Sequence, residues 1–268
     1  MGFKLIAVDM DGTLLNSEGK ISEKTVDAIR NLSKTDVIFT ISTGRPIHGV
    51  QKYNTQLHLM GPIITYNGAM IVNAETQEIL FEEGLSREDA ETIWKLGEQA
   101  GVTMCIWSNN QLYGNRLDKR IHDYKKLSGV EPLLADKEQL LNQGITKILW
   151  YDEVDRIRRF CRELSPELFS QVTFCTSKPV FLEFFSSKVS KAVAMKKIGE
   201  LYNIQREEMI AIGDGLNDLS MIEYAGLGVA MENAEKAVKD TAQYITASND
   251  EDGVAKVIET FVIKRNCL

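Results

Sequence analysis

Two aspartates, Asp9 and Asp11, end an apolar run near the start of the chain, and Gly12 follows them. The run has the composition of a buried strand, in which alternate side chains share a face. Two full charges about 4 Å apart repel by roughly 4 kcal/mol at an effective dielectric near 20, so such a pair favours acid/base chemistry or Mg²⁺. The alternative is an ordinary Asp-Gly turn at the end of a strand. An EF-hand does not fit, because Thr13 and Leu14 occupy its fifth and sixth positions.

Two later apolar runs, at 37–42 and 209–212, also end in polar residues. In open α/β sheets, ligands bind beyond the carboxyl ends of the strands, so we expect these polar residues to meet at one edge. Thr43 and Gly44 follow the first run, and the second run is followed by Asp214, Asn217 and Asp218. Lys191 stands at the start of the helix predicted before the second run.

This set matches the requirements of phosphate-ester hydrolysis. The reaction needs a nucleophile, an acid for the leaving oxygen, and cations that neutralise the phosphoryl oxygens. An aspartate nucleophile forms an aspartyl-phosphate, and a general acid contributes about 10²–10⁴ in rate. Mg²⁺ prefers a few carboxylates with water and phosphate oxygens, which suits Asp9 and Asp214. Gly12 and Gly44 would let backbone amides approach the phosphate closely.

The patterns along the chain predict two domains. Segments that alternate between strand and helix at both ends predict an α/β fold, a Rossmann-like doubly wound parallel-sheet core. The core is predicted at residues 1–82 and 188–268, with an inserted α+β cap domain at 83–187. Ser22 and Ser86 are expected to cap helices. In the cap, strands are predicted at 102–107, 112–115, 146–151, 171–175 and 180–185, and helices near 118–128 and 153–164, with several strands alternating as in a one-sided sheet.

Composition limits the possible partners. The chain has 268 residues, 44% of them hydrophobic, and a net charge of −7, which argues against nucleic-acid and anionic-membrane surfaces. The four cysteines have no metal-ligand spacing and are expected to be reduced packing residues; they are Cys105, Cys161, Cys175 and Cys267. No signal peptide or membrane span is indicated, so a cytoplasmic location is expected. A small phosphorylated metabolite is the expected partner.

Four segments in order resemble the motifs of the haloacid dehalogenase (HAD) superfamily, and in particular its Cof-type sugar phosphatases. These segments are Asp9-Met10-Asp11-Gly12-Thr13, Ser42-Thr43-Gly44-Arg45, Lys191 within Val189-Ser190-Lys191-Ala192, and Gly213-Asp214-Gly215-Leu216-Asn217-Asp218. The resemblance covers essentially the whole chain. It implies a HAD-like core and a large α/β (C2-type) cap between the second and third motifs.

The resemblance also implies a role for each motif residue. Asp9 would be the nucleophile and Asp11 the general acid/base. The phosphoryl group would be bound by Thr43, Gly44, Lys191 and Asn217. Mg²⁺ would be held by Asp9, Asp214 and the Asp11 backbone carbonyl, with Asp218 supporting the site without binding the metal. Further candidates for contacting the substrate are Arg45, Asn67 and Arg116.

Several alternatives remain at this stage. A phosphotransferase or phosphomutase shares the aspartyl-phosphate and differs only in the acceptor. A receiver-type regulatory domain also uses an acidic cluster, but it has no use for Asp11 as an acid or for a large cap. Asn67-Gly68 also fits a tight hairpin turn. The acidic segment 249–253 precedes the last predicted helix, where negative charge is favourable, so helix stabilisation is preferred over metal binding.

Overall fold

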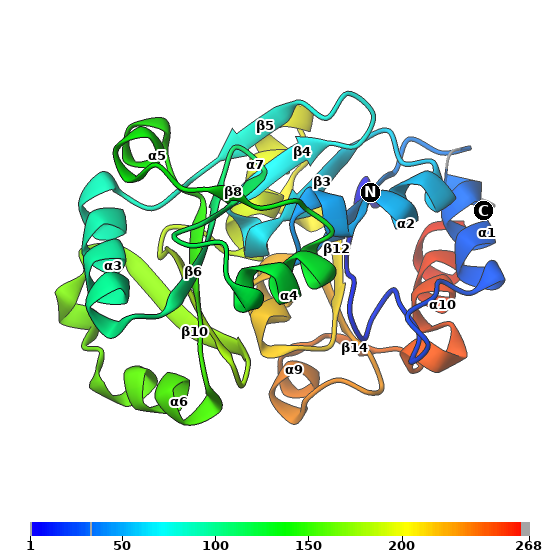
Figure 1. The fold of residues 1–268 in the computed structure, drawn as a ribbon. Helices are drawn as coiled ribbons and strands as arrows, with labels where there is room; N and C mark the ends of the chain where they lie inside the picture. The colour runs from blue at the N-terminus through cyan, green and yellow to red at the C-terminus, as the bar shows by residue number, and fades with distance from the viewer. Residues whose placement is uncertain (1, 33, 264–268) are drawn as a thin grey trace. The chain divides into compact units, whose positions relative to one another are not determined.

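The structure is a computed structural model that describes residues 2–32 and 34–263 (Figure 1). The chain forms two compact units. The first, called the core unit, comprises Met1–Gly44, Val50–Phe81 and Ser190–Leu268. The second, called the cap unit, comprises Arg45–Gly49 and Glu82–Val189. Cys267 lies outside the described residues.

The core unit is built on one twisted sheet with the strand order β14-β13-β12-β1-β2-β3-β4-β5. Neighbouring strands from β14 to β3 run parallel, whereas β4 is antiparallel to β3. The strands are β1 (Leu5–Asp9), β2 (Ile38–Ser42), β3 (Pro62–Thr65), β4 (Met70–Asn73), β5 (Ile79–Glu82), β12 (Met209–Gly213), β13 (Leu227–Ala230) and β14 (Tyr244–Ile245).

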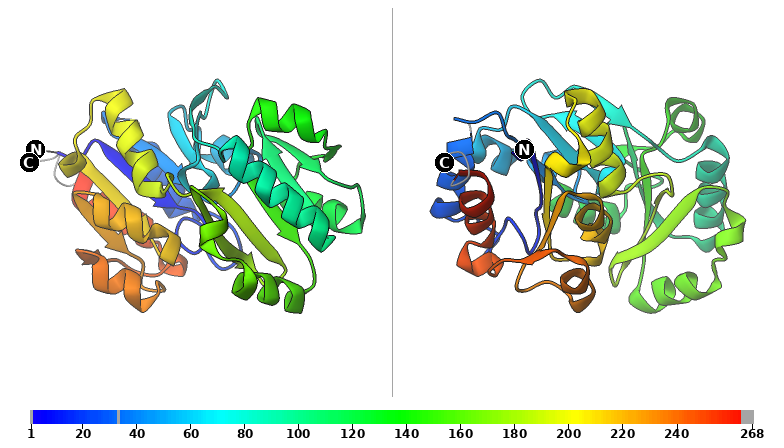
Figure 2. Two further views of the ribbon diagram at one scale, coloured as in Figure 1. Left: turned by 90° about the vertical axis from the view of Figure 1, so that its left-hand side faces the viewer. Right: turned by 180° about the vertical axis from the view of Figure 1, so that it is seen from behind.

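Helices cover both faces of this sheet, which explains the continuous apolar strands. All residues of β1 and β12 are buried. On one face α1 (Glu23–Leu32) packs against α10 (Gly253–Ile258), and on the other α7 (Lys191–Tyr202) packs against α8 (Leu219–Tyr224) (Figure 2). Ser22 caps α1 as expected, because its Oγ accepts a hydrogen bond of 3.1 Å from the Thr25 amide. The core unit also contains the short helices α2 (Gln51–Leu57) and α9 (Lys236–Thr241).

The cap unit has a second, mixed sheet with the order β10-β11-β9-β6-β7-β8. Its strands are β6 (Thr103–Ser108), β7 (Gln111–Gly114), β8 (Leu133–Leu134), β9 (Lys147–Tyr151), β10 (Val172–Lys178) and β11 (Phe181–Ser186). Its helices are α3 (Arg87–Ala100), α4 (Lys119–Ser128), α5 (Lys137–Gln143) and α6 (Val154–Glu163). Ser86 caps α3, since its side chain accepts from the Asp89 amide at 3.1 Å.

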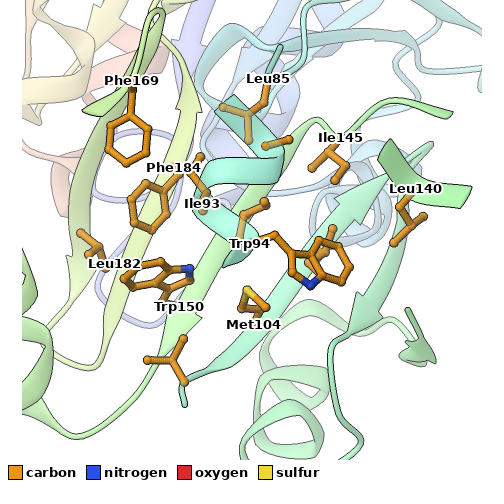
Figure 3. Packing of buried hydrophobic residues seen from close by; sticks show 14 of the residues in the cluster. Leu85, Ile93, Trp94, Met104, Leu140, Ile145, Trp150, Phe169, Leu182 and Phe184 are labelled. Carbon is orange, nitrogen blue, oxygen red and sulfur yellow. The ribbon is translucent and has the colours of Figure 1, made fainter. Parts of the chain in front are cut away.

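One face of the cap sheet forms the hydrophobic core of the unit. Figure 3 shows Trp150 and Phe184 from the strands pointing toward Ile93 and Trp94 of α3. The Trp150 and Phe184 rings lie 4.8 Å apart between centroids, within the range of favourable aromatic pairs. This cluster gives the cap unit a core of its own.

The α/β fold class with an α+β cap is confirmed, but several details of the prediction are wrong. Strand β6 is buried along its whole length rather than on one side, because Tyr124 of α4 covers Trp107 on the second face. The short elements β8 and α5 were not predicted. Cys105 is buried, but Cys175 is exposed and so does not pack in a core. Within the described ranges, no helix is long and apolar enough to cross a membrane.

Candidate active site

The predicted site residues of the core unit come from the carboxyl ends of three adjacent strands. Asp9 is the last residue of β1, Thr43 follows β2, and Asp214 follows β12. Both neighbours of β1 are parallel to it, with Asp9 opposite Ser42 and Val8 opposite Ile212. The three strand ends therefore lie side by side at one edge of the sheet.

Lys191 provides a positive charge at the centre of this edge. It begins α7, after the helix cap Ser190, and only 1% of its surface is exposed. Its ammonium group donates to the Asp9 carboxylate, to Asp218 Oδ1 at 2.6 Å and to the Ser42 carbonyl at 2.8 Å. A buried charge is tolerated only when it is paired and hydrogen-bonded, and these three acceptors meet that need.

Burial and neighbouring charges change the acidity of these groups. Burial raises the pKa of Asp9 to about 7, although the nearby Lys191 opposes the shift and Asp218 adds to it. Burial lowers the pKa of Lys191, but the attraction of Asp9 and Asp218 outweighs that effect, so its pKa is raised. Lys191 therefore stays protonated and favours the ionised form of Asp9.

Asp218 is fully buried and both of its carboxylate oxygens are engaged within the protein. Oδ1 accepts from Lys191, and Oδ2 accepts from the backbone amides of Asp214 and Gly215, each at 3.0 Å. Asp218 thereby connects the lysine to the loop that carries Asp214. This arrangement agrees with a supporting role for Asp218.

The carboxylates of Asp9, Asp214 and Asp218 offer oxygens that lie within 4.8 Å of one another, a spacing that suits a metal ion. Burial raises the pKa of Asp214, a hydrogen bond from Thr13 opposes that shift, and the charges of Asp218 and Asp11 reinforce it. The clustered negative charges and hard oxygen donors fit a divalent cation such as Mg²⁺. Because both Asp218 oxygens are engaged, Asp9 and Asp214 are the better suited ligands.

Gly12 lets the first motif approach Asp214 closely. Its φ of +84° lies in the left-handed region, and a Cβ at this position would be 2.3 Å from Asp214 Oδ2. The neighbouring Thr13 donates to Asp214 Oδ1 at 2.7 Å, and Asn233 donates to the Gly12 carbonyl at 2.8 Å. The loop after β1 is thus fixed against the loop after β12.

Asn67 contacts both the second motif and Asn217. The Asn67 amide donates to the Thr43 carbonyl at 3.0 Å, and its side chain accepts from Asn217 Nδ2 at 3.2 Å. A Cβ on Gly44 would lie 3.0 Å from Asn67 Oδ1. The structure therefore groups Thr43, Gly44, Asn67 and Asn217.

The remaining predicted residues are placed as follows. Asp11 is exposed beyond the end of β1, where its backbone forms an isolated bridge with Leu15. Arg45 belongs to the cap unit and donates to the Gly49 carbonyl at 3.4 Å. Arg116, also in the cap unit, is exposed and donates to the Val102 carbonyl at 2.7 Å. A substrate contact by either arginine stays a prediction.

Several contributors were missed in the sequence. The role of Thr13 was detectable, because it lies inside the first motif. Asn233 carried no local signal, since its partner Gly12 is 221 positions away. The acidic segment 249–253 also has a role beyond that predicted, because Asp250 accepts from the Ser17 amide and hydroxyl and Asp252 accepts from the Ser22 hydroxyl. These bonds tie the last helix to the loop that follows the first motif.

A doubly wound sheet with a lysine–aspartate cluster at its strand ends fits an aspartate-based hydrolase. The family model for haloacid dehalogenase-like hydrolases matches residues 6–258. The chain belongs to this family, and more narrowly to the Cof-type phosphatases with a cap domain. It is a phosphatase that acts on phosphoric monoesters.

Individual relatives align over nearly the whole chain. The 5-amino-6-(5-phospho-D-ribitylamino)uracil phosphatase YcsE of Bacillus subtilis is 35% identical, with 97% of this chain and 96% of the relative covered. The phosphatase YitU of the same organism, named for the same substrate, is 31% identical, with 96% of this chain and 97% of the relative covered. A haloacid dehalogenase-like hydrolase from Bacteroides thetaiotaomicron has a solved structure that superposes with a TM-score of 0.85, at 32% identity and with 96% and 98% covered.

Proposed function

We propose that the protein is a Mg²⁺-dependent phosphatase that hydrolyses small phosphomonoesters, sugar phosphates among them, through an aspartyl-phosphate on Asp9. The observation that carries this proposal is the buried ammonium group of Lys191, which bonds both Asp9 and Asp218 at the strand ends. A fixed cation beside a carboxylate favours the ionised form of the nucleophile, against the effect of burial, and attracts the phosphate dianion.

The reaction proceeds in two displacements. A carboxylate oxygen of Asp9 attacks phosphorus and the P–O bond to the leaving group breaks, while Asp11 donates its proton to the leaving oxygen. Asp11, now ionised, takes a proton from water, and the resulting hydroxide attacks the phosphorus of the aspartyl-phosphate. The P–O bond to Asp9 breaks, and inorganic phosphate and the original protonation states are regenerated. The exposed position of Asp11 allows contact with both the leaving group and water.

The other residues bind and neutralise the phosphoryl group. Thr43, Gly44 and Asn217 supply hydrogen-bond donors, and Lys191 supplies charge. Asp9, Asp214 and the backbone carbonyl of Asp11 would hold Mg²⁺. When bound, the ion supplies charge neutralisation that lets an anionic nucleophile approach an anionic ester. Asp218 fixes Lys191 relative to the loop that carries Asp214, through hydrogen bonds to both.

The names of two relatives support the substrate class. YcsE and YitU are named for a substrate whose phosphate is on a ribityl chain. A polyhydroxylated phosphomonoester is therefore the class we propose for this chain. Because the chain has a net charge of −7, capture of an anionic substrate depends on local cations such as Lys191.

The experiment is phosphate release from p-nitrophenyl phosphate and a panel of sugar phosphates by the wild type and two variants. Asp9→Asn should lower kcat by roughly 10⁴-fold or more, because the amide cannot attack phosphorus. Asp27→Asn, which makes the same charge change on the exposed face of α1, should match the wild type. Chelator should abolish wild-type activity and added Mg²⁺ should restore it.

Two results would contradict the proposal. Turnover by a folded Asp9→Asn protein at the wild-type rate would exclude Asp9 as the nucleophile. Full activity in excess chelator would exclude the metal. Release of free phosphate without transfer to added sugar hydroxyls distinguishes hydrolysis from a phosphomutase reaction.

A further inference from the structure

The turn between β3 and β4 is strained and lies in the core unit next to the site. Its three residues Tyr66, Asn67 and Gly68 all have positive φ, at 51°, 56° and 100°. Only glycine adopts this region freely, and a bulky residue such as tyrosine is an outlier there. Tyr66 is also 2% exposed, so the strain is maintained by a buried side chain. Strained backbone of this kind persists only where the surrounding structure requires it.

The turn contacts the helix that carries Lys191. A Cβ on Gly68 would lie 2.2 Å from the Ser190 carbonyl oxygen and 3.0 Å from the Lys191 amide nitrogen. Ser190 is the cap of α7, and its Oγ accepts from the Val193 amide at 3.2 Å. The turn therefore packs directly against the start of α7.

Asn67 connects this turn to two other motif loops. Its backbone amide donates to the Thr43 carbonyl at 3.0 Å, and its side chain lies against Gly44. Its Oδ1 accepts from the Asn217 carboxamide at 3.2 Å, across 150 positions in the sequence. Asn217 itself is exposed, so its side chain would sample several rotamers without such a partner.

The chemistry of the two carboxamides explains what the contact achieves. A carboxamide nitrogen carries two hydrogens, and the bond to Asn67 uses one of those on Asn217. The second hydrogen is then held in a fixed direction and remains available for a phosphoryl oxygen. Left-handed backbone is tolerated by asparagine better than by most residues that have a side chain, which accounts for asparagine at this position.

We propose that Asn67 is a positioning residue, which orients the Asn217 carboxamide toward the phosphoryl group and thereby acts on catalysis through Asn217. The inference rests on the proposed function, in which Asn217 binds that group. It assigns Asn67 a role different from the substrate contact expected from the sequence. Its effect is on the phosphoryl group, so it is independent of the leaving group.

The test is a double-mutant cycle on kcat/KM with Mg²⁺ present, using p-nitrophenyl phosphate and one sugar phosphate. Asn67→Gly keeps the left-handed backbone and removes only the carboxamide. It should lower kcat/KM by about tenfold, the upper range for one neutral hydrogen bond, and by the same factor for both esters. In an Asn217→Ala background the same substitution should change kcat/KM by less than about twofold, because the coupled partner is gone.

The matched control is Asn203→Gly. Asn203 also has left-handed backbone, with φ of 53°, and it is exposed at the carboxyl end of α7. This variant should retain wild-type kcat/KM. Thermal denaturation of each variant shows whether it is folded, and the coupling energy is evaluated only on folded proteins.

Several results would overturn the proposal. They are wild-type kcat/KM in Asn67→Gly, wild-type kcat/KM in Asn217→Ala, independent losses that multiply in the double variant, and a loss that differs between the two esters. The last would instead place Asn67 on the leaving group. Failure of the proposed function is recognised separately, because Asp9→Asn would then remain active whatever the outcome of the cycle.

Discussion

Gly12→Ala tests whether the close approach of the first motif to Asp214 determines activity. The variant adds one methyl group at a position whose φ is +84° and which faces the Asp214 carboxylate. The change has two separable effects, backbone strain and displacement of Asp214. A second glycine in the same loop allows the two to be measured independently.

The magnitude of each effect follows from the structure. Alanine in the left-handed region costs about 1–2 kcal/mol of stability. The added Cβ would lie 2.3 Å from Asp214 Oδ2, whereas ordinary contacts begin at 3.4 Å, so the carboxylate must move by about 1 Å. A misplacement of about 1 Å at a reacting centre costs on the order of 10²-fold in rate, or about 2.7 kcal/mol of transition-state stabilisation.

Gly19→Ala is the matched control. Gly19 also has positive φ, at +71°, but a Cβ added there would have no heavy atom of the described residues within 4 Å, apart from those of Gly19 itself and its two chain neighbours. Both variants should therefore lose similar stability in thermal denaturation. Only Gly12→Ala should lower kcat/KM by about 10²-fold and raise the Mg²⁺ concentration for half-maximal activity by about 10- to 100-fold.

The measurement is phosphate release as a function of Mg²⁺ concentration for the wild type and both variants. Values of kcat/KM for Gly12→Ala and Gly19→Ala within about threefold of each other would show that the approach of Gly12 to Asp214 does not determine activity. A Mg²⁺ dependence of Gly12→Ala equal to that of the wild type would show that the substitution does not disturb the metal site. Equal losses in both variants would show that strain in the loop, and not the position of Asp214, limits activity.

The remaining predictions concern the cap unit, whose unfolding can be followed by fluorescence because it contains all three tryptophans. Asp89 accepts hydrogen bonds from Ser86, Ser170 and Gln171, which offset its burial and lower its pKa, so Asp89→Asn should cost about 2 kcal/mol at pH 7. Because the pKa of Asp89 in the folded protein lies below the unfolded value of about 3.9, this stabilisation is complete above about pH 3.9 and is lost as the pH falls through the folded pKa. A loss of stability in Asp89→Asn that is equal at pH 7 and in strong acid would contradict this role of Asp89. Lys147 bonds Glu183 at 2.8 Å in a buried pair, so Lys147→Met should cost about 3–5 kcal/mol in urea denaturation, and Lys147→Met combined with Glu183→Leu should recover most of it. Additive losses in the double variant would disprove the pairing.

The sequence was sufficient to predict the fold class and the order of the motif residues. Buried parallel strands are continuous apolar runs, and the polar residues that end them stand out against that background. Since neighbouring parallel strands place their carboxyl ends at one edge, the sequence was enough to group Asp9, Thr43 and Asp214. Helix caps such as Ser22 and Ser86 were also predictable, because their partners lie three residues away.

Elements whose stability depends on tertiary contacts were not predictable. Strand β8 has two residues and α5 has seven, too few for a periodic pattern to be recognised. The burial of both faces of β6 depends on Tyr124 of α4, which the alternation within the strand could not reveal. The position of Cys175 on the surface likewise depends on its neighbours in space.

The first motif shows most clearly which features the sequence predicts and which depend on tertiary structure. The sequence predicted that Asp9 and Asp11 form a carboxylate pair that requires a cation, provided that the strand continues as far as Asp11. In the structure β1 ends at Asp9 and Asp11 is exposed, so the carboxylates that gather with Asp9 are those of Asp214 and Asp218. Only the tertiary structure brings the Lys191 ammonium group within hydrogen-bonding distance of both Asp9 and Asp218, and Gly12 against Asp214. It also placed Asn67 against Asn217. These contacts join residues that are far apart in the chain, and no local pattern encodes a hydrogen bond whose two partners are brought together only when the sheet and its helices are packed.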